Sequence, residues 1–364
     1  NNYINKNLDL INSSVFPGYN KIISSLKYLQ KSGYCKNNKG ICHLKNGKSY
    51  YEFLVKNYTG SSKSVLELKS DIQSRLMKDM RTMYSILTVN PELENMFYSE
   101  EHKSKSPQAI LKELNSKYTD DFPNIGNINY TVKYVDENLQ DYLSPAFFLT
   151  PAIDDTNNNV IYINKSDAFS KQDIYTTLAH EGIPGHMYQS AFFIQTNPLP
   201  VRHILSYGGY TEGWATYVEF LSYSYKYSDQ RLAKALSCSA SYSLALYSLC
   251  DIGINYEGWS FKETKDFLKN YNITGDDICK NIYQTVINEP ANYLQYYVGY
   301  LEITALKEKV QKQLGTDFNL KDFHKSFLTI GPALKPLKNG YTPFTDKDNI
   351  VRVGNSSQSA QSIF

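Results

Sequence analysis

Hydrophobic residues recur at helical spacing along most of the chain. In residues 64–87 and 107–118, apolar side chains return every three or four positions and so share one face. The same spacing predicts later helices over residues 211–225, 230–253, 264–271, 274–287, 291–314 and 320–328. Residues 130–134 and 160–163 resemble strands, with the turn-rich residues 154–159 just before the second. The pattern therefore predicts a mostly α-helical fold with a small β-sheet.

A further helix links the small sheet to the later helices. It begins at about residue 171 and runs into the most informative motif of the chain, which ends at residue 189. Strand 160–163 comes just ahead of this helix, which suits an edge strand with which an extended substrate pairs. The alternative is that it is an ordinary core strand. We expect one domain over residues 1–340 and an irregular, Ser- and Gln-rich extension over residues 341–364.

Charge and composition narrow the class of protein. The chain has 364 residues, with 38 Lys and Arg against 36 Asp and Glu, which gives a net charge of +2. This balance argues against a nucleic-acid partner, because such proteins need a basic surplus. The sequence also contains no apolar run long enough for a transmembrane segment. The 32 tyrosines fit either a biased genome or an aromatic-lined cleft, and composition does not separate the two.

The cysteines and the first residues bear on the compartment. Cys35 and Cys42 lie in one polar loop, near enough for a disulfide, which favours an exported or cell-surface protein over a cytoplasmic one. Apolar or helical surroundings predict a core position for Cys238, Cys250 and Cys279. The chain opens with Asn-Asn-Tyr, without Met or a signal peptide, which indicates a processed or excised piece.

Residues 177–189 read TLAHEGIPGHMYQ and carry the clearest chemistry. A His-Glu pair on a helix, followed by a second His, is typical of zinc peptidases, in which two imidazoles bind the metal and the Glu polarises water. Here six positions separate His180 from His186, which on an ideal helix would point the two rings too far apart to share an ion. Pro184 and its neighbouring glycines predict a break that brings His186 back. The alternative is a structural His186 after a Pro-Gly turn.

Residues 210–219, YTEGWATYVE, offer a third ligand. Thr211 is a plausible N-cap, which would place Glu212 in the first turn of a helix, with Glu219 on the same face. Two His and a Glu from a later helix leave one position open for water, as a catalytic zinc requires. The alternative is that Glu212 only favours the helix dipole and that Glu219 is solvated.

These motifs resemble those of the bacterial family called "domain of unknown function 885". Its pattern H-E-x-x-P-G-H-x-x-Q, followed by E-G-W-A-x-Y-x-E, is present at residues 180–189 and 212–219, and P-x(5)-Y-x-x-G at residues 290–299. With its closing motif, the resemblance covers about residues 30–340, and family members generally extend further at the N-terminus. The two metal-motif segments are also similar to those of M32 carboxypeptidases and M1 aminopeptidases.

The resemblance implies a zincin-like metallopeptidase fold of the gluzincin type, with one Zn²⁺ per chain. The implied zinc ligands are His180, His186 and Glu212. Glu181 would be the general base that activates a metal-bound water for attack on a peptide bond. Glu219 would orient a ligand histidine or hold a proton.

Two further roles need residues outside the metal motifs. An oxyanion donor is expected on a later helix, where the candidates are Tyr296, Tyr297 and His324. Arg202 and His203 are candidates for binding a substrate carboxylate, with a structural or surface salt bridge as the alternative for the arginine.

The sequence thus predicts a zinc metallopeptidase of carboxypeptidase or oligopeptidase type, acting on a peptide substrate. Two alternatives stay open: a non-catalytic, metal-containing binding or cell-surface module of the same fold, and a metal-dependent amidase or esterase. The oligomeric state stays open as well.

Overall fold

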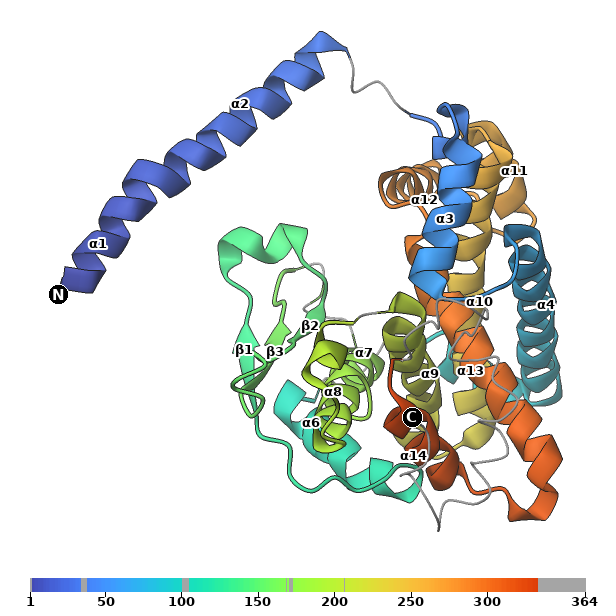
Figure 1. The fold of residues 1–364 in the computed structure, drawn as a ribbon. Coiled ribbons are helices and arrows are strands. Elements are labelled where there is room, and N and C mark those ends of the chain that lie inside the picture. Colours follow the sequence, from blue (N-terminus) through green and yellow to red (C-terminus); the bar gives the residue numbers. More distant parts are fainter. Residues whose placement is uncertain are drawn as a thin grey trace.

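The computed structural model describes residues 2–33, 38–99, 105–167, 169, 173–205 and 207–332. Helices dominate it, with a small sheet to one side (Figure 1). The helices are α1 (Asn2–Leu10), α2 (Phe16–Ser32), α3 (Gly47–Thr59), α4 (Val65–Val89), α5 (Glu94–Phe97), α6 (Pro107–Lys117), α7 (Tyr175–Glu181), α8 (His186–Gln195), α9 (Gly208–Lys226), α10 (Gln230–Ile252), α11 (Phe261–Lys269), α12 (Asp276–Asn288), α13 (Asn292–Leu314) and α14 (Leu320–Ile330). The predicted extension over residues 341–364 lies outside the described residues.

Amphipathic patterns account for the long helices. Helix α4 begins with a capping box, in which the Ser64 hydroxyl accepts from the Glu67 amide and the Glu67 carboxylate accepts from the Ser64 amide. Its apolar face packs against α10, and α9 packs against both α10 and α13. Helices expected from the spacing are present with boundaries shifted by a few residues. Helices α1, α2 and α3 were not predicted.

Two glycines bring α9 and α13 into close contact. A Cβ added at Gly213 would lie 2.5 Å from the backbone of Gly299, so the two helices touch without side chains between them. This contact fixes where the side chains of α13 lie relative to those of α9.

The small sheet contains three strands among the described residues. They are β1 (Tyr130–Tyr134), β2 (Ala146–Leu149) and β3 (Asn159–Ile163), in the order β1-β3-β2. β1 runs parallel to β3, whereas β2 runs antiparallel to it, with Phe148 opposite Ile161. The predicted edge role of strand 160–163 is therefore wrong, because β3 is paired on both sides. The unpredicted strand β2 is the edge strand that contacts α7.

The N-terminal helices extend away from the rest of the molecule (Figure 1). Helices α1 and α2 bury none of their residues. Within the described part of the chain, none of the helices combines the length and apolar character needed to cross a bilayer.

The described cysteines fall into two groups, three in the core and one near the surface. Cys238, Cys250 and Cys279 are buried, as predicted. Cys42 donates to the carbonyl of Ile254 at 3.4 Å. Cys42 is thus a free thiol, which contradicts the predicted Cys35–Cys42 disulfide; Cys35 itself lies outside the described residues.

Candidate metal centre

The predicted break between the two histidines is present. Helix α7 ends at Glu181, α8 begins at His186, and the Ile183–Pro184 peptide between them is cis. Gly185 is required here, because an added Cβ would lie 1.7 Å from the carbonyl oxygen of His180. The chain therefore doubles back closely enough for the second histidine to face the first.

His180, His186 and Glu212 converge on one point. Each offers a ligand atom, and these atoms lie within 4.8 Å of one another. Glu212 Oε2 is 3.3 Å from His186 Nε2 and 3.6 Å from His180 Nε2. The two imidazole rings stand nearly perpendicular, with centroids 4.8 Å apart. Two ring nitrogens and one carboxylate oxygen are therefore directed at a shared volume.

Helix α9 supplies both glutamates from one face. Glu212 faces the two Nε2 atoms, and seven residues later Glu219 Oε2 lies 2.9 Å from Nδ1 of His180. A carboxylate at Nδ1 holds the proton on that nitrogen and leaves Nε2 free to bind a metal. The predicted N-cap is wrong, because α9 already begins at Gly208 and the Thr211 hydroxyl donates to the Tyr207 carbonyl.

The electrostatics of the centre favour a cation. Burial alone would lower the pKa of His180, but the nearby carboxylates of Glu212, Glu219 and Glu181 outweigh it and raise this pKa to about 10. Burial would raise the pKa of Glu212, but the two histidines lower it to about 2. The site therefore stabilises positive charge between these groups: without a metal this charge is a second proton on His180, which a cation bound at Nε2 would displace.

The donor set fits a transition metal. Neutral imidazole and carboxylate groups suit zinc and other divalent first-row ions, and three protein ligands leave a position open for water. The side chains of His180, His186 and Glu212 keep exposed fractions of 12%, 15% and 24%, so solvent can reach the candidate centre.

Glu181 lies between the metal centre and the sheet. Its Oε2 accepts a hydrogen bond of 2.8 Å from the backbone amide of Phe148, in the edge strand β2. The carboxylate next to the first histidine is thereby held at the end of α7 and against the strand edge. Phe148 was not expected in the site, because the contact joins segments 33 positions apart.

The three oxyanion candidates differ sharply in position. Tyr296 faces the centre, with its ring centroid 6.3 Å from that of His180. Burial, and then the charges of Glu212 and Glu181, raise its pKa. Tyr297 is fully buried and its hydroxyl lies 3.1 Å from Ser241 Oγ, away from the metal centre.

His324 is also removed from the candidate site. It is fully buried, with Nδ1 2.7 Å from the Asp121 carbonyl and Nε2 2.9 Å from the Tyr217 hydroxyl. Its ring stacks on Phe122 with centroids 4.1 Å apart. Burial lowers the pKa of His324 to about 3. With both nitrogens occupied, His324 is a core residue, and its predicted role as an oxyanion donor is wrong.

A cleft of about 460 Å³ adjoins the metal centre on the side of α8. His186 and Glu212 line it, and so do both predicted substrate-binding residues, Arg202 and His203. Arg202 donates from Nη2 to the carbonyls of residues 330 and 332 at 2.5 and 2.8 Å, so its contacts are structural but are made with backbone carbonyls and not through the salt bridge given as the alternative. His203 packs edge-on against Phe193, with ring centroids 5.7 Å apart.

Sequence reasoning missed the side chains that hold the break in place. Trp214 Nε1 donates to the Pro184 carbonyl at 3.0 Å, and Gln189 Nε2 donates to the Tyr210 carbonyl at 3.4 Å. Both residues belong to the two motifs, but neither carries metal-binding chemistry. The only sign in the sequence that Trp214 and Gln189 matter was that each occupies a defined position of its motif.

Solved structures share this fold. A structure described as a "putative lipoprotein" from Colwellia psychrerythraea matches with a TM-score of 0.76 and 22% identity, over 95% of this chain and 61% of that chain. Another of the same description, of unknown function, from Shewanella oneidensis matches with a TM-score of 0.62 and 17% identity, over 89% of this chain and 63% of that chain. This chain thus spans less than two thirds of either protein.

The chain matches a protein family but none of the curated proteins. No curated protein matches the chain. The family described as "Bacterial protein of unknown function (DUF885)" matches residues 2–338, which confirms the resemblance seen in the sequence motifs. The chain therefore belongs to this family.

Proposed function

We propose that this protein is a zinc-dependent metallopeptidase with a zincin-like fold of the gluzincin type. The observation that carries the proposal is the convergence of His180, His186 and Glu212 to within 4.8 Å, in spite of a spacing that no continuous helix would allow. A general base, Glu181, stands beside this set, and a carboxylate, Glu219, supports its first histidine.

The residues divide the chemistry of peptide hydrolysis among them. A zinc ion held by the two histidines and Glu212 would polarise the substrate carbonyl and lower the pKa of water. Glu181 would take the proton from the attacking water as the new C–O bond forms. It would return that proton to the leaving nitrogen as the C–N bond breaks. The Tyr296 hydroxyl would donate a hydrogen bond to the oxyanion.

Strand β2 supports a peptide as the substrate class. Its outer edge faces α7, and the Phe148 amide points away from β3 towards Glu181. An extended peptide can add to such an edge through backbone hydrogen bonds. The substrate carbonyl would then compete with Glu181 for the Phe148 amide and release this carboxylate for proton transfer.

Metal analysis tests the proposal first. Elemental analysis of the purified chain should find about one zinc per chain, and His186→Ala or Glu212→Ala should lose it. His43→Ala is the matched control, because His43 is exposed and lies outside the centre. Equal zinc in the wild type and His186→Ala would remove His186 from the ligand set.

Hydrolysis assays then separate the peptidase from the alternatives. Cleavage of a peptide library by the zinc-loaded chain supports the proposal. Cleavage of esters or simple amides alone would favour the amidase or esterase. Stoichiometric zinc without any hydrolysis would favour the non-catalytic binding module.

We also propose an exported or cell-surface location. The support for this location is that both similar solved structures are described as a "putative lipoprotein". Fractionation of the native host, with an antibody against this chain, tests it. Recovery with cytoplasmic markers alone would contradict it.

A further inference from the structure

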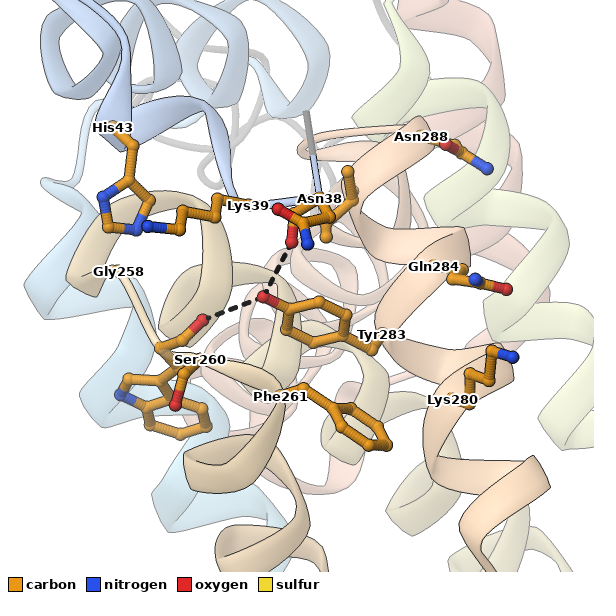
Figure 2. Close-up of a pocket in the computed structure, with 12 residues that line it drawn as sticks. Asn38, Lys39, His43, Gly258, Ser260, Phe261, Lys280, Tyr283, Gln284 and Asn288 are labelled. Carbon is orange, nitrogen blue, oxygen red and sulfur yellow. Dashed lines mark hydrogen bonds between the residues drawn. The ribbon is translucent and has the colours of Figure 1, made fainter. Parts of the chain in front are cut away.

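A second hollow lies away from the metal centre, between η2 (Ile41–His43), the junction of η7 (Gly253–Glu257) with α11, and α12 (Figure 2). It has a volume of about 750 Å³, within the range of small-molecule sites. None of its lining residues lines the cleft at the metal centre. We call it the α12 hollow; its lining residues are Asn38, Lys39, His43, Gly258, Trp259, Ser260, Phe261, Lys280, Tyr283, Gln284, Ile287 and Asn288.

Aromatic rings line the middle of the α12 hollow. Phe261 and Tyr283 meet edge to face, with ring centroids 5.5 Å apart. The Tyr283 hydroxyl lies 3.2 Å from the Asn38 carbonyl and 3.5 Å from the Trp259 carbonyl and can donate its one hydrogen to either, so this ring is held in place (Figure 2). Fixed rings of this kind favour a flat, apolar group as the ligand.

Among the described residues that line the α12 hollow, the charged side chains are all basic. Lys39 and Lys280 line it together with His43, and none of the described lining residues is Asp or Glu. The nearby carboxylates have other partners: Glu263 accepts from the Ser260 amide, and Asp276 pairs with Lys265. A concave site lined by one sign of charge attracts ligands of the opposite sign.

Side-chain amides complete the lining. Gln284 and Asn288 come from α12, and Asn38 lies beside the Tyr283 hydroxyl (Figure 2). Amides donate and accept hydrogen bonds, and so can orient a polar ligand without adding charge.

We infer that the α12 hollow binds a small anionic compound that carries a flat ring, with a phosphate or carboxylate as the negative group. The rings of Phe261 and Tyr283 contact the ligand ring, and Lys280 attracts the negative group. This inference does not depend on the proposed peptidase activity.

Tryptophan fluorescence offers a direct test, because Trp259 lines the hollow whereas Trp214, the second of the chain's two tryptophans, is fully buried. The probes are phenylphosphate and phenylacetate, with benzyl alcohol as the uncharged ring and inorganic phosphate as the anion without a ring. We expect saturable binding of at least one anionic ring compound, at least about tenfold tighter than that of benzyl alcohol or phosphate. Whichever of phenylphosphate and phenylacetate binds more tightly identifies the negative group of the ligand as a phosphate or a carboxylate.

Variants assign the binding to this hollow. Lys280→Ala should weaken binding of the anionic probe by about three- to fivefold, whereas Lys309→Ala, which removes an exposed lysine of α13 outside the hollow, should change it by less than about twofold. Phe261→Ala should weaken the binding of the anionic ring compounds and of benzyl alcohol to a similar extent. No saturable change with either anionic ring compound would overturn the inference. Equal binding of benzyl alcohol would also overturn it, and so would a Lys280→Ala variant that binds like the wild type.

Discussion

Two histidines on opposite sides of α9 differ in the charge that their surroundings favour. His180 faces Glu212 and Glu219, and these carboxylates overcome burial and raise its pKa to about 10. His324 contacts the same helix through the Tyr217 hydroxyl, a neutral partner, and burial lowers its pKa to about 3. Both rings are well buried.

The comparison teaches that the partners of a buried histidine in this fold decide whether it can serve as a metal ligand, as proposed for His180, or belongs to the core. A carboxylate fixes the proton of an imidazole and leaves its other nitrogen available to a metal, whereas two neutral partners occupy both nitrogens.

The largest effect is expected from Glu181→Gln, on the metal side of α9. The amide cannot accept the proton of water, so hydrolysis should fall by about a thousandfold. The zinc content should stay unchanged, because Glu181 is not in the ligand set. Parallel kinetics and elemental analysis check this, with Glu94→Gln, an exposed glutamate, as the control. Full activity in Glu181→Gln would rule out its role as general base.

Adjacent tyrosines of α13 provide a matched pair. Tyr296→Phe should lower kcat by about a hundredfold through loss of an oxyanion donor, with zinc retained. Tyr297→Phe should leave kcat near that of the wild type, because its hydroxyl contacts Ser241. Steady-state kinetics of the two variants decide between them. Equal rates in both would remove Tyr296 from catalysis.

Glu219→Gln should weaken the ligand character of His180. Without the carboxylate at Nδ1, zinc affinity should fall by about ten- to a hundredfold. Competition with a chelator measures the affinity, and circular dichroism confirms that α9 remains folded. An unchanged affinity would show that Glu219 does not support the ligand.

The smallest effect on activity is expected on the other side of α9. In zinc-loaded protein, His324→Phe should keep both zinc and kcat, but it leaves the buried Tyr217 hydroxyl without its partner, which costs about 1–3 kcal/mol of unfolding free energy. Denaturant unfolding and kinetics check this. Loss of zinc from a folded His324→Phe variant would contradict the separation of the two regions.

The pH dependence of stability should also change in His324→Phe. In the wild type, unfolded His324 binds a proton below about pH 6.5, whereas the folded state excludes it down to about pH 3. Its contribution to stability is therefore complete above about pH 6.5 and falls by about 1.4 kcal/mol per pH unit as the pH drops towards 3. Denaturant titrations at several pH values should show a shallower acid loss in the variant.

Much of the helical framework followed from residue spacing. The capping box at Ser64 and the apolar face of α4 are local signals, and local signals predict helices well. Strand β2 was missed because four residues, AFFL, carry too short a pattern to distinguish strand from core. Helices α1 and α2 also went unpredicted.

The candidate site was predictable only as far as its motifs reached. The pairing of His180 with Glu212 was suggested by residue types and spacing. The choice between Tyr296 and Tyr297 was not, because it depends on the rotation of α13 against α9. Likewise, the burial of His324 arises from contacts with segments more than a hundred positions away.

The close contact between Gly213 and Gly299 has a consequence for motion. Helices without side chains between them have little room to slide, so α9 and α13 should open together. Their central amides should therefore exchange hydrogen for deuterium slowly and at matching rates. Glu212 and Tyr296, one on each helix, would then keep a constant separation while the surrounding loops fluctuate.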